Sequence, residues 1–197
     1  MKKKVFIISL IVLIASCLFA LGMIVQSNLT KKVVYLDLEE TEIVEDNLEH
    51  KYNFLPPELS DYIVKLCSEL ELEDELVVAI LLKENPELNF EAMNRNLNGT
   101  VDLGLWQLND KYLYTDFQRN FWKFEDIELN AFNWKHNTFI AIHQIEWLNN
   151  QLKTFDDTVM AYNCGINAVI NGEIPQSTKK YLCSVKHSYQ LLRGEVN

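Results

Sequence analysis

The chain has 197 residues, with 28 acidic and 18 basic side chains and a net charge of −10 at pH 7. That charge argues against nucleic acid as a partner, because phosphate binding relies on a surface rich in Lys and Arg. Hydrophobic residues make up 48% of the chain while Gly and Pro are scarce, which predicts one mainly α globular domain with accessory segments.

Residues 1–26 form a segment distinct from the rest. Three lysines lie near its start, and an apolar run without charge follows from Val5 to Val25. Such a run is long enough to cross a bilayer, for which about 20 residues suffice, and the lysines would stay in the cytoplasm. An uncleaved membrane anchor or signal-anchor helix is the favoured prediction. The stretch Ile14–Cys17 is similar to a bacterial lipobox, so a lipoprotein attached through Cys17 is the alternative.

Both alternatives predict that the rest of the chain lies outside the cytoplasm, in the cell envelope, and in the periplasm where an outer membrane is present. Residues 27–55 are acidic, with little helical periodicity, and predict a poorly ordered stalk or linker. The globular domain is predicted to cover residues 56–197.

Two helices are predicted at the start of this domain, over residues 56–72 and 73–85, from apolar positions at helical spacing. An Asn-rich segment without a period follows over residues 86–102 and predicts a loop. Residues 103–110 are short and mostly apolar. Nothing here alternates in the way that predicts a strand.

Three more helical patterns follow in the second half of the domain. They cover residues 133–152, residues 155–172 with a break at Gly165, and residues 174–194. Together with the first two, they predict a compact bundle of about six helices, with its chemistry on the connecting loops and helix ends.

The cysteines and histidines do not predict a metal site, because they lack the spacing of zinc ligands. Cys164 and Cys183 could pair if the last two helices pack together, although small buried thiols are the favoured prediction for these two residues. His136 and His143 lie seven residues apart on one helical pattern and are predicted at the helix surface. No cofactor is expected.

A carboxylate interrupts the apolar stripe of the second helix. Val77, Ile80 and Leu81 occupy one face at i, i+3 and i+4, and Glu84 takes the i+7 position of that face. Burial and the negative end of the helix dipole would both raise the pKa of this carboxyl. Pro86 predicts that the helix ends there, so Glu84 would face the following loop with a proton to donate.

Three stretches downstream carry a family resemblance. They are NGTVDLGLWQLN at residues 98–109, MAYNCG at 160–165 and IPQSTKKYL at 174–182. In their order and spacing they resemble the lytic transglycosylase family, whose SLT-type domain has a lysozyme-like fold and a catalytic Glu at the end of its second long helix. The resemblance covers about residues 56–193 and implies a lysozyme-like helical bundle in which Glu84 holds the catalytic position.

The resemblance implies that the chain cleaves peptidoglycan glycan strands between N-acetylmuramic acid and N-acetylglucosamine. Glu84 would act as the general acid and then as the base, and the product would be a 1,6-anhydro sugar. The positions that match the motifs imply substrate binding by Gln107, Tyr162, Asn163, Gly104 and Tyr181. From the residues alone, core packing for the two tyrosines, a helix cap for Asn163 and a tight turn for Gly104 remain open.

The sequence departs from the family pattern at three motif positions. Asn85 replaces the Ser expected after the catalytic Glu, Ser177 replaces a Glu, and Cys164 replaces an Ala. Trp106 is predicted in the core, and Tyr112, Trp122 and Trp134 are candidate walls of a groove.

Two other functions remain as alternatives. A lysozyme-type hydrolase would need a second carboxylate to activate water, and Asp102 is the nearest candidate in the sequence. A non-catalytic peptidoglycan-binding domain of a wall-spanning machine would keep the fold without cleavage. The partners expected are therefore glycan strands, the membrane through the N-terminal segment, and the machinery of the cell envelope.

Overall fold

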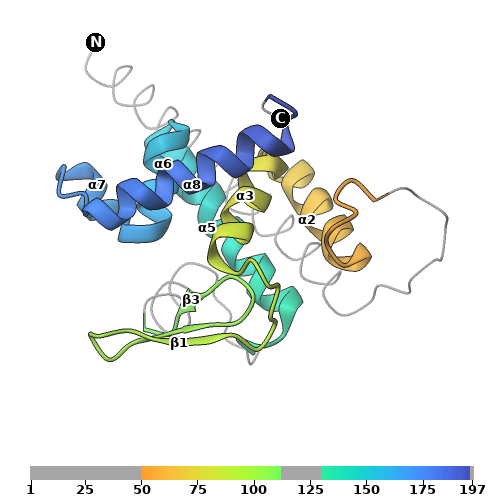
Figure 1. Cartoon of the computed structure of the whole chain (residues 1–197), viewed down its shortest axis with the longest axis horizontal. Helices are drawn as coiled ribbons and strands as arrows, with labels where there is room; N and C mark the ends of the chain where they lie inside the picture. Colours follow the sequence, from red (N-terminus) through yellow and green to blue (C-terminus); the bar gives the residue numbers. More distant parts are fainter. Residues whose placement is uncertain (1–49, 112–129, 196–197) are drawn as a thin grey trace, which may run out of the picture. The chain divides into compact units, whose positions relative to one another are not determined.

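The computed structural model describes residues 50–111 and 130–195 (Figure 1). The predicted anchor over residues 1–26, with Cys17, lies outside the described residues, as does most of the predicted stalk. Within the two described ranges, no helix is both long and apolar enough to cross a bilayer. The described residues belong to one compact unit, Leu48–Asn197.

The described residues just before the predicted start of the domain pack against it. Tyr52 and Leu55 are buried. Lys51 donates hydrogen bonds to the carboxylates of Asp74 and Glu75 at 2.8 and 2.9 Å. This short segment, predicted as stalk, is thereby attached to the N-terminus of the second helix.

The first two predicted helices are present as α2 (Pro57–Glu69) and α3 (Asp74–Glu84). Pro57 opens α2, where its missing N–H costs no helical hydrogen bond. All residues of α3 from Leu76 to Leu81 are buried, so the prediction of a single apolar stripe on this helix is too narrow. A helix that is apolar on every side lies inside the protein, and α3 packs against both α8 and α2.

The prediction of a loop without strands over residues 86–102 is wrong. This region and the next residues form an antiparallel three-stranded sheet in the order β1-β2-β3. Its strands are β1 (Met93–Arg95), β2 (Val101–Leu103) and β3 (Leu108–Asn109).

The first hairpin of the sheet is stabilised by its turn rather than by a buried face. All residues of β1 are exposed, so the strand lacks the alternation from which strands are predicted. In the turn, the N–H of Asn96 donates to the carbonyl of Thr100 at 2.9 Å. The side-chain oxygen of Asn98 accepts from the N–H of Thr100 at 3.1 Å. Asn residues form such turns readily.

The long helix α5 (Trp134–Leu152) crosses the middle of the fold. The side chain of Asn133 caps its N-terminus by accepting from the N–H groups of Lys135 and His136. His143 is buried within α5, and its Nδ1 lies 2.8 Å from the carbonyl oxygen of Phe139. The prediction of a surface position for His143 is therefore wrong, because this face of α5 is turned to the core.

The last helices are α6 (Phe155–Cys164), α7 (Ile166–Ile170) and α8 (Gln176–Leu192). Gly165 separates α6 from α7 with a φ of 86°, a left-handed conformation that favours glycine. This confirms the predicted break.

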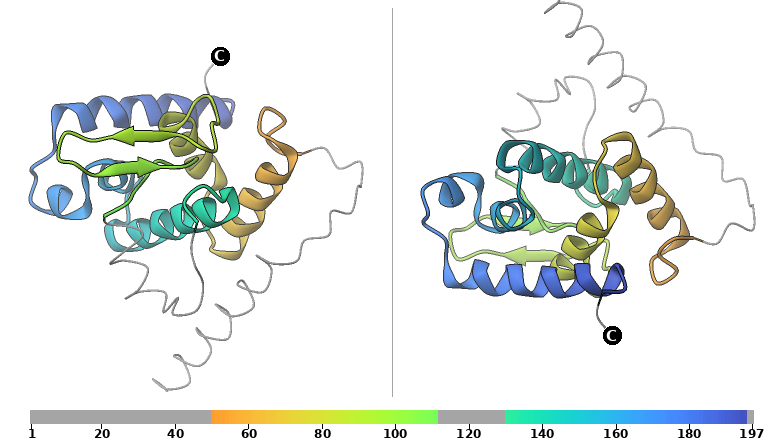
Figure 2. Two further views of the ribbon diagram at one scale, coloured as in Figure 1. Left: turned by 90° about the horizontal axis from the view of Figure 1, so that it is seen from below. Right: turned by 90° about the horizontal axis from the view of Figure 1, so that it is seen from above.

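The described residues thus form a mainly α fold of six helices with one small sheet, as predicted for the fold class. Figures 1 and 2 show α8 running beside α3, with the hairpin of β1 and β2 on one side of the molecule and α6 and α7 on another. The core contains α3 and the buried side of α5, together with Leu105, Trp106 and Leu108. The predicted core position of Trp106 is confirmed.

Candidate active site

Glu84 is the last residue of α3, and its carboxyl is largely enclosed by the protein. Burial is the largest influence on this group and raises its pKa to about 7. The hydrogen bond from Tyr181 lowers the pKa, the charge of Asp102 raises it, and the charge of Lys83 lowers it. The net effect agrees with the direction expected for a carboxyl that loses water without gaining a paired cation.

The end of α3 is held by Asn85, one of the three residues that differ from the motifs of the resembled family. Its side chain is buried and bonded on both sides. The amide nitrogen donates to the carbonyls of Asn89 at 2.7 Å and Leu105 at 3.2 Å, and the amide oxygen accepts from the N–H of Asn89 at 3.0 Å. Asn85 therefore ties the helix end to the turn after Pro86 and to the segment before β3.

Glu84 opens into a groove with a volume of about 730 Å³. One wall comes from the sheet and its hairpin, another from α5, and the third from the end of α6 and the start of α7. The residues with the strongest bearing on chemistry are Glu84, Asp102, Gln107, Gln144, Trp147, Tyr162 and Asn163.

Gln107, a predicted substrate-binding residue, lies in the lining of the groove. Its side-chain nitrogen donates to the carbonyl of Gly104 at 2.9 Å, across a tight turn in which Gln107 has a φ of 50°. The turn holds the amide at the groove between β2 and β3.

Gly104, another predicted substrate-binding residue, packs against the start of α5. It is not among the described residues that line the groove. A Cβ on Gly104 would lie 2.4 Å from the carbonyl oxygen of Ala131 and 2.7 Å from the side-chain nitrogen of Asn137. Only glycine fits this contact, which brings the chain against the N-terminal turn of α5. The alternative of a tight turn describes Gly104 better than contact with substrate.

Tyr162 and Asn163 both line the groove near the end of α6. The hydroxyl of Tyr162 donates to the carbonyl of Trp106 at 3.2 Å. The amide oxygen of Asn163 accepts from the hydroxyl of Thr178 at 2.7 Å, which connects the end of α6 to the start of α8. Asn163 itself remains exposed.

Tyr181 is buried and lies behind the groove rather than in its lining. Its hydroxyl donates to Oε1 of Glu84 at 2.6 Å. Burial, followed by the charge of Glu84, raises the pKa of Tyr181 well above its usual value, so the hydroxyl remains a donor. The structure brings Tyr181 into contact with the candidate catalytic carboxyl.

Asp102 is the second carboxylate of the groove and comes from β2. Asn109 of β3 donates to its Oδ1 at 2.7 Å. The same Asn109 nitrogen donates to the hydroxyl of Thr100 at 2.8 Å. The position of Asp102 is therefore defined by the sheet that the sequence did not predict.

Several residues that line the groove were not predicted as site residues from the sequence. Gln144 and Trp147 lie three residues apart on α5 and share a face, a spacing visible in the sequence. Asn96 and Asn98 come from the turn between β1 and β2, and Asn167 comes from α7. Of the candidate groove walls, Trp134 packs edge-on against the ring of Tyr62 at 5.7 Å, whereas Tyr112 and Trp122 lie outside the described residues.

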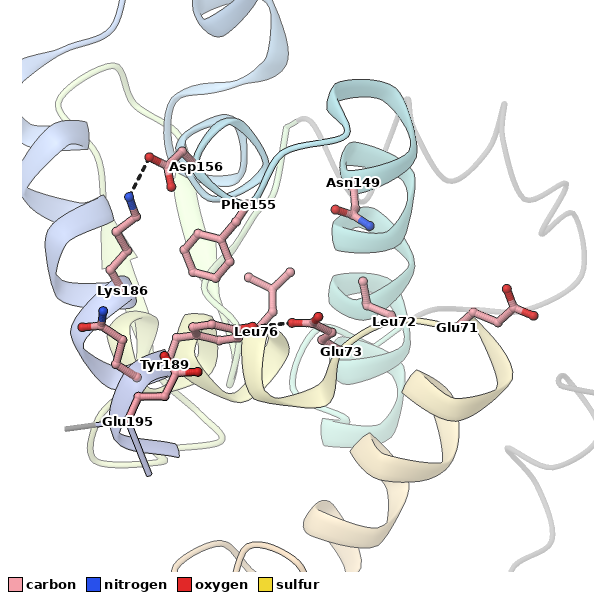
Figure 3. A pocket seen from close by; sticks show the side chains of 11 residues that line it. Glu71, Leu72, Glu73, Leu76, Asn149, Phe155, Asp156, Lys186, Tyr189 and Glu195 are labelled. Carbon is pink, nitrogen blue, oxygen red and sulfur yellow. Dashed lines mark hydrogen bonds and ion pairs between the residues drawn. The ribbon is translucent and has the colours of Figure 1, made fainter. Parts of the chain in front are cut away.

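A second cavity of about 550 Å³ lies near the N-terminus of α3 and the C-terminal part of α8 (Figure 3). Two of its acidic side chains have partners on α8. Lys186 forms an ion pair with Asp156 at 2.7 Å, and the hydroxyl of Tyr189 donates to Glu73. Unlike the groove, this cavity contains a basic side chain.

The described cysteines form no disulfide and belong to no metal site. Cys67, Cys164 and Cys183 are free thiols, and Cys67 is buried. The prediction of buried thiols is wrong for Cys183, which is exposed, and Cys164 is only half-buried. In the part of the chain that the structure describes, no three His, Cys, Asp or Glu side chains are placed to hold a metal ion.

Comparison with known proteins gives a family and a fold. The family model of the transglycosylase SLT domain matches residues 61–182, which is more than half of the chain. No curated protein matches. Among solved structures, an X-ray structure of an inactive mutant of the lytic transglycosylase Slt from Pseudomonas aeruginosa matches with a TM-score of 0.55 and 16% identity. The match covers 68% of this chain but 24% of that enzyme, so at this identity it shows the fold alone.

Proposed function

Because the chain belongs to the transglycosylase SLT domain family, we propose that it is a peptidoglycan lytic transglycosylase in which Glu84 acts first as an acid and then as a base. The observation that carries this proposal is the carboxyl of Glu84, which opens into a groove and has a pKa raised to about 7. A group with that pKa can give up a proton and take one back near neutral pH.

The first step is protonation of the leaving glycosidic oxygen by Glu84. The sugar's own 2-acetamido group stabilises the positive charge that develops at C1, a substrate-assisted route outside the two-carboxylate scheme. In the second step, the ionised Glu84 takes the proton of the 6-hydroxyl of N-acetylmuramic acid while that oxygen attacks C1. One bond to C1 breaks and one forms, no water is consumed, and the product is a 1,6-anhydro sugar.

The neighbours of Glu84 support both steps. The hydroxyl of Tyr181 at 2.6 Å keeps the carboxyl in one orientation and stabilises it when ionised. Gln107, Tyr162 and Asn163 line the same groove, where they would bind the acetamido and hydroxyl groups of the glycan. Asn85 replaces a Ser of the family pattern, yet its three hydrogen bonds leave the end of α3 well supported.

Product analysis tests the proposal. Purified sacculi are digested with the protein, and the released fragments are analysed by mass spectrometry. Anhydro ends support the transglycosylase, and Glu84→Gln should abolish their release. Binding of sacculi without any release of fragments would instead support a non-catalytic wall-binding domain.

A lysozyme-type hydrolase is the second candidate, because Asp102 lines the groove with Glu84. A hydrolase would use Asp102 to activate water and would leave reducing ends. Asp102→Asn distinguishes the two chemistries. It should abolish cleavage by a hydrolase, whereas a transglycosylase should continue to form anhydro ends.

The place of action is also a proposal. The charge-free run from Val5 to Val25 supports an anchored enzyme whose catalytic domain lies in the cell envelope, with a lipid at Cys17 as the alternative. Membrane fractionation of the full chain and of Cys17→Ala tests it. If the Cys17→Ala protein stays in the membrane and differs in mass from the wild type only by the substitution itself, the uncleaved anchor is favoured.

A further inference from the structure

The groove face of α5 carries a polar atom that has no hydrogen-bond partner among the described residues. Gln144, Trp147 and Leu148 lie at i, i+3 and i+4, so their side chains share one face of the helix, and all three line the groove. The side-chain oxygen of Gln144 is buried, and within the part of the chain that the structure describes it accepts no hydrogen bond.

Such an atom is rare in a folded protein. Nearly all buried polar side-chain atoms have a hydrogen-bond partner, and an exception calls for a physical reason. Several other amides at the groove already have one. Gln107 donates to Gly104, Asn109 donates to Asp102, and Asn163 accepts from Thr178. The oxygen of Gln144 is thus an acceptor left open on a wall of the groove.

The charge of the groove limits what this acceptor binds. Glu84 and Asp102 are the charged residues in the described lining, which contains no Lys or Arg. An anionic ligand group would find no counterion there, and burying an unpaired charge is costly. The oxygen of Gln144 therefore suits a neutral N–H or O–H donor, and Trp147 and Leu148 supply an apolar wall beside it.

We propose that Gln144 is a substrate-binding residue whose amide oxygen accepts a hydrogen bond from an N–H or O–H group of the bound glycan. The inference rests on the proposed function for the identity of the ligand. It predicts that substitution of Gln144 weakens glycan binding without a loss of stability, because the oxygen has no bond to lose in the free protein.

The test compares Gln144→Met with Gln151→Met. Both remove an amide from α5, but Gln151 is exposed and is not among the groove residues. Both changes are made in the Glu84→Gln protein, so that binding of purified uncross-linked glycan strands is measured by calorimetry without cleavage. Gln144→Met should raise Kd between about twofold and tenfold, the effect of one neutral hydrogen bond. Gln151→Met should leave Kd unchanged.

Two further readouts separate binding from packing. The Tm of Gln144→Met should equal or exceed that of its parent, since the substitution removes a buried atom without a partner. In the protein that keeps Glu84, KM should rise by a similar factor while kcat stays within about twofold. An unchanged Kd overturns the inference. A weaker Kd accompanied by a lower Tm also overturns it, because Gln144 would then support the fold.

The outcomes also separate the inference from the proposed function. Anhydro products together with an unchanged Kd for Gln144→Met would remove the inference and leave the enzyme assignment in place. Weaker binding by Gln144→Met in a chain that never cleaves glycan would keep the inference and remove the assignment.

Discussion

Two tyrosine–glutamate pairs connect α8 to α3, one near each end of the contact between these helices. Tyr181 donates to Glu84 beside the groove, and Tyr189 donates to Glu73 beside the second cavity (Figure 3). The chemical groups are the same, but the surroundings differ. The carboxyl of Glu84 is largely enclosed and lacks an ion-pair partner among the described residues, whereas the side chain of Glu73 is 60% exposed and lies 3.8 Å from Arg193.

The comparison separates what a hydrogen bond does from what burial does. In the outer pair, Arg193 also donates a hydrogen bond to the hydroxyl of Tyr189 at 2.9 Å. The carboxyl of Glu73 is exposed to solvent. That arrangement is a surface cross-link of small energy. In the inner pair, the loss of water raises the pKa of Glu84 more than the hydrogen bond from Tyr181 lowers it. The pKa of Glu84 is therefore about 7, and the carboxyl remains largely protonated below that pH.

The largest expected effect is on activity. Glu84→Gln should reduce fragment release from sacculi by about 10²- to 10⁴-fold, the usual contribution of a general acid or base. The matched change at the outer pair, Glu73→Gln, should leave release within about twofold. Release rates for both variants check this, and equal losses at the two positions would show that the chemistry does not depend on the enclosed carboxyl.

The next effect is on stability. A folded-state pKa of about 7, against the ordinary 4.5, means that the folded protein binds more protons between these pH values. The free energy of unfolding should therefore decline as pH rises from about 4.5 through 7. The Glu84→Gln variant has no carboxyl at this position, so its free energy of unfolding should not show this decline. Relative to the wild type, its free energy of unfolding should rise by up to about 3 kcal/mol over that pH interval.

Denaturant unfolding at pH 5 and pH 8 measures this change. A stability difference between wild type and Glu84→Gln that is the same at both pH values would contradict a raised pKa at Glu84.

Smaller changes should move the pH profile in opposite directions. Activity requires protonated Glu84 and should fall as pH rises above about 7. Tyr181→Phe removes the bond that lowers the pKa of Glu84, so the decline should move to higher pH. Asp102→Asn removes a charge that raises this pKa, so the decline should move to lower pH. The profiles of kcat/KM check both, and shifts in one common direction would contradict the assigned causes.

The smallest effect is expected at the outer pair. Tyr189→Phe removes a hydrogen bond between largely exposed groups and should lower the free energy of unfolding by about 1 kcal/mol or less. The pH profile of activity should not move. A shift of the profile similar to that of Tyr181→Phe would mean that the two pairs are coupled through α8.

The position of Glu84 could be predicted from the sequence because it depends on residues close to it in the chain. Helical spacing places the residue among buried side chains, and Pro86 marks the end of the helix. The break at Gly165 is local in origin as well, because glycine readily adopts the positive φ found there.

The rest of the site depends on contacts that local patterns do not contain. Tyr181 meets Glu84 across 97 residues of chain. The sheet that presents Asp102 has an exposed first strand, which removes the alternation expected of a strand. For Gly104, the motif left approach to the glycan and a tight turn open, and the position of Asn137 in α5 gives a structural reason for the glycine. Its surroundings come from a helix some thirty residues further along the chain.

The bond between Tyr181 and Glu84 also makes the candidate catalytic carboxyl dependent on the packing of α8 against α3. Because a domain folds as a unit, the burial that raises the pKa of Glu84 requires the folded domain with α8 in place. A fragment that ends before α8 would leave this carboxyl in water and ionised near neutral pH.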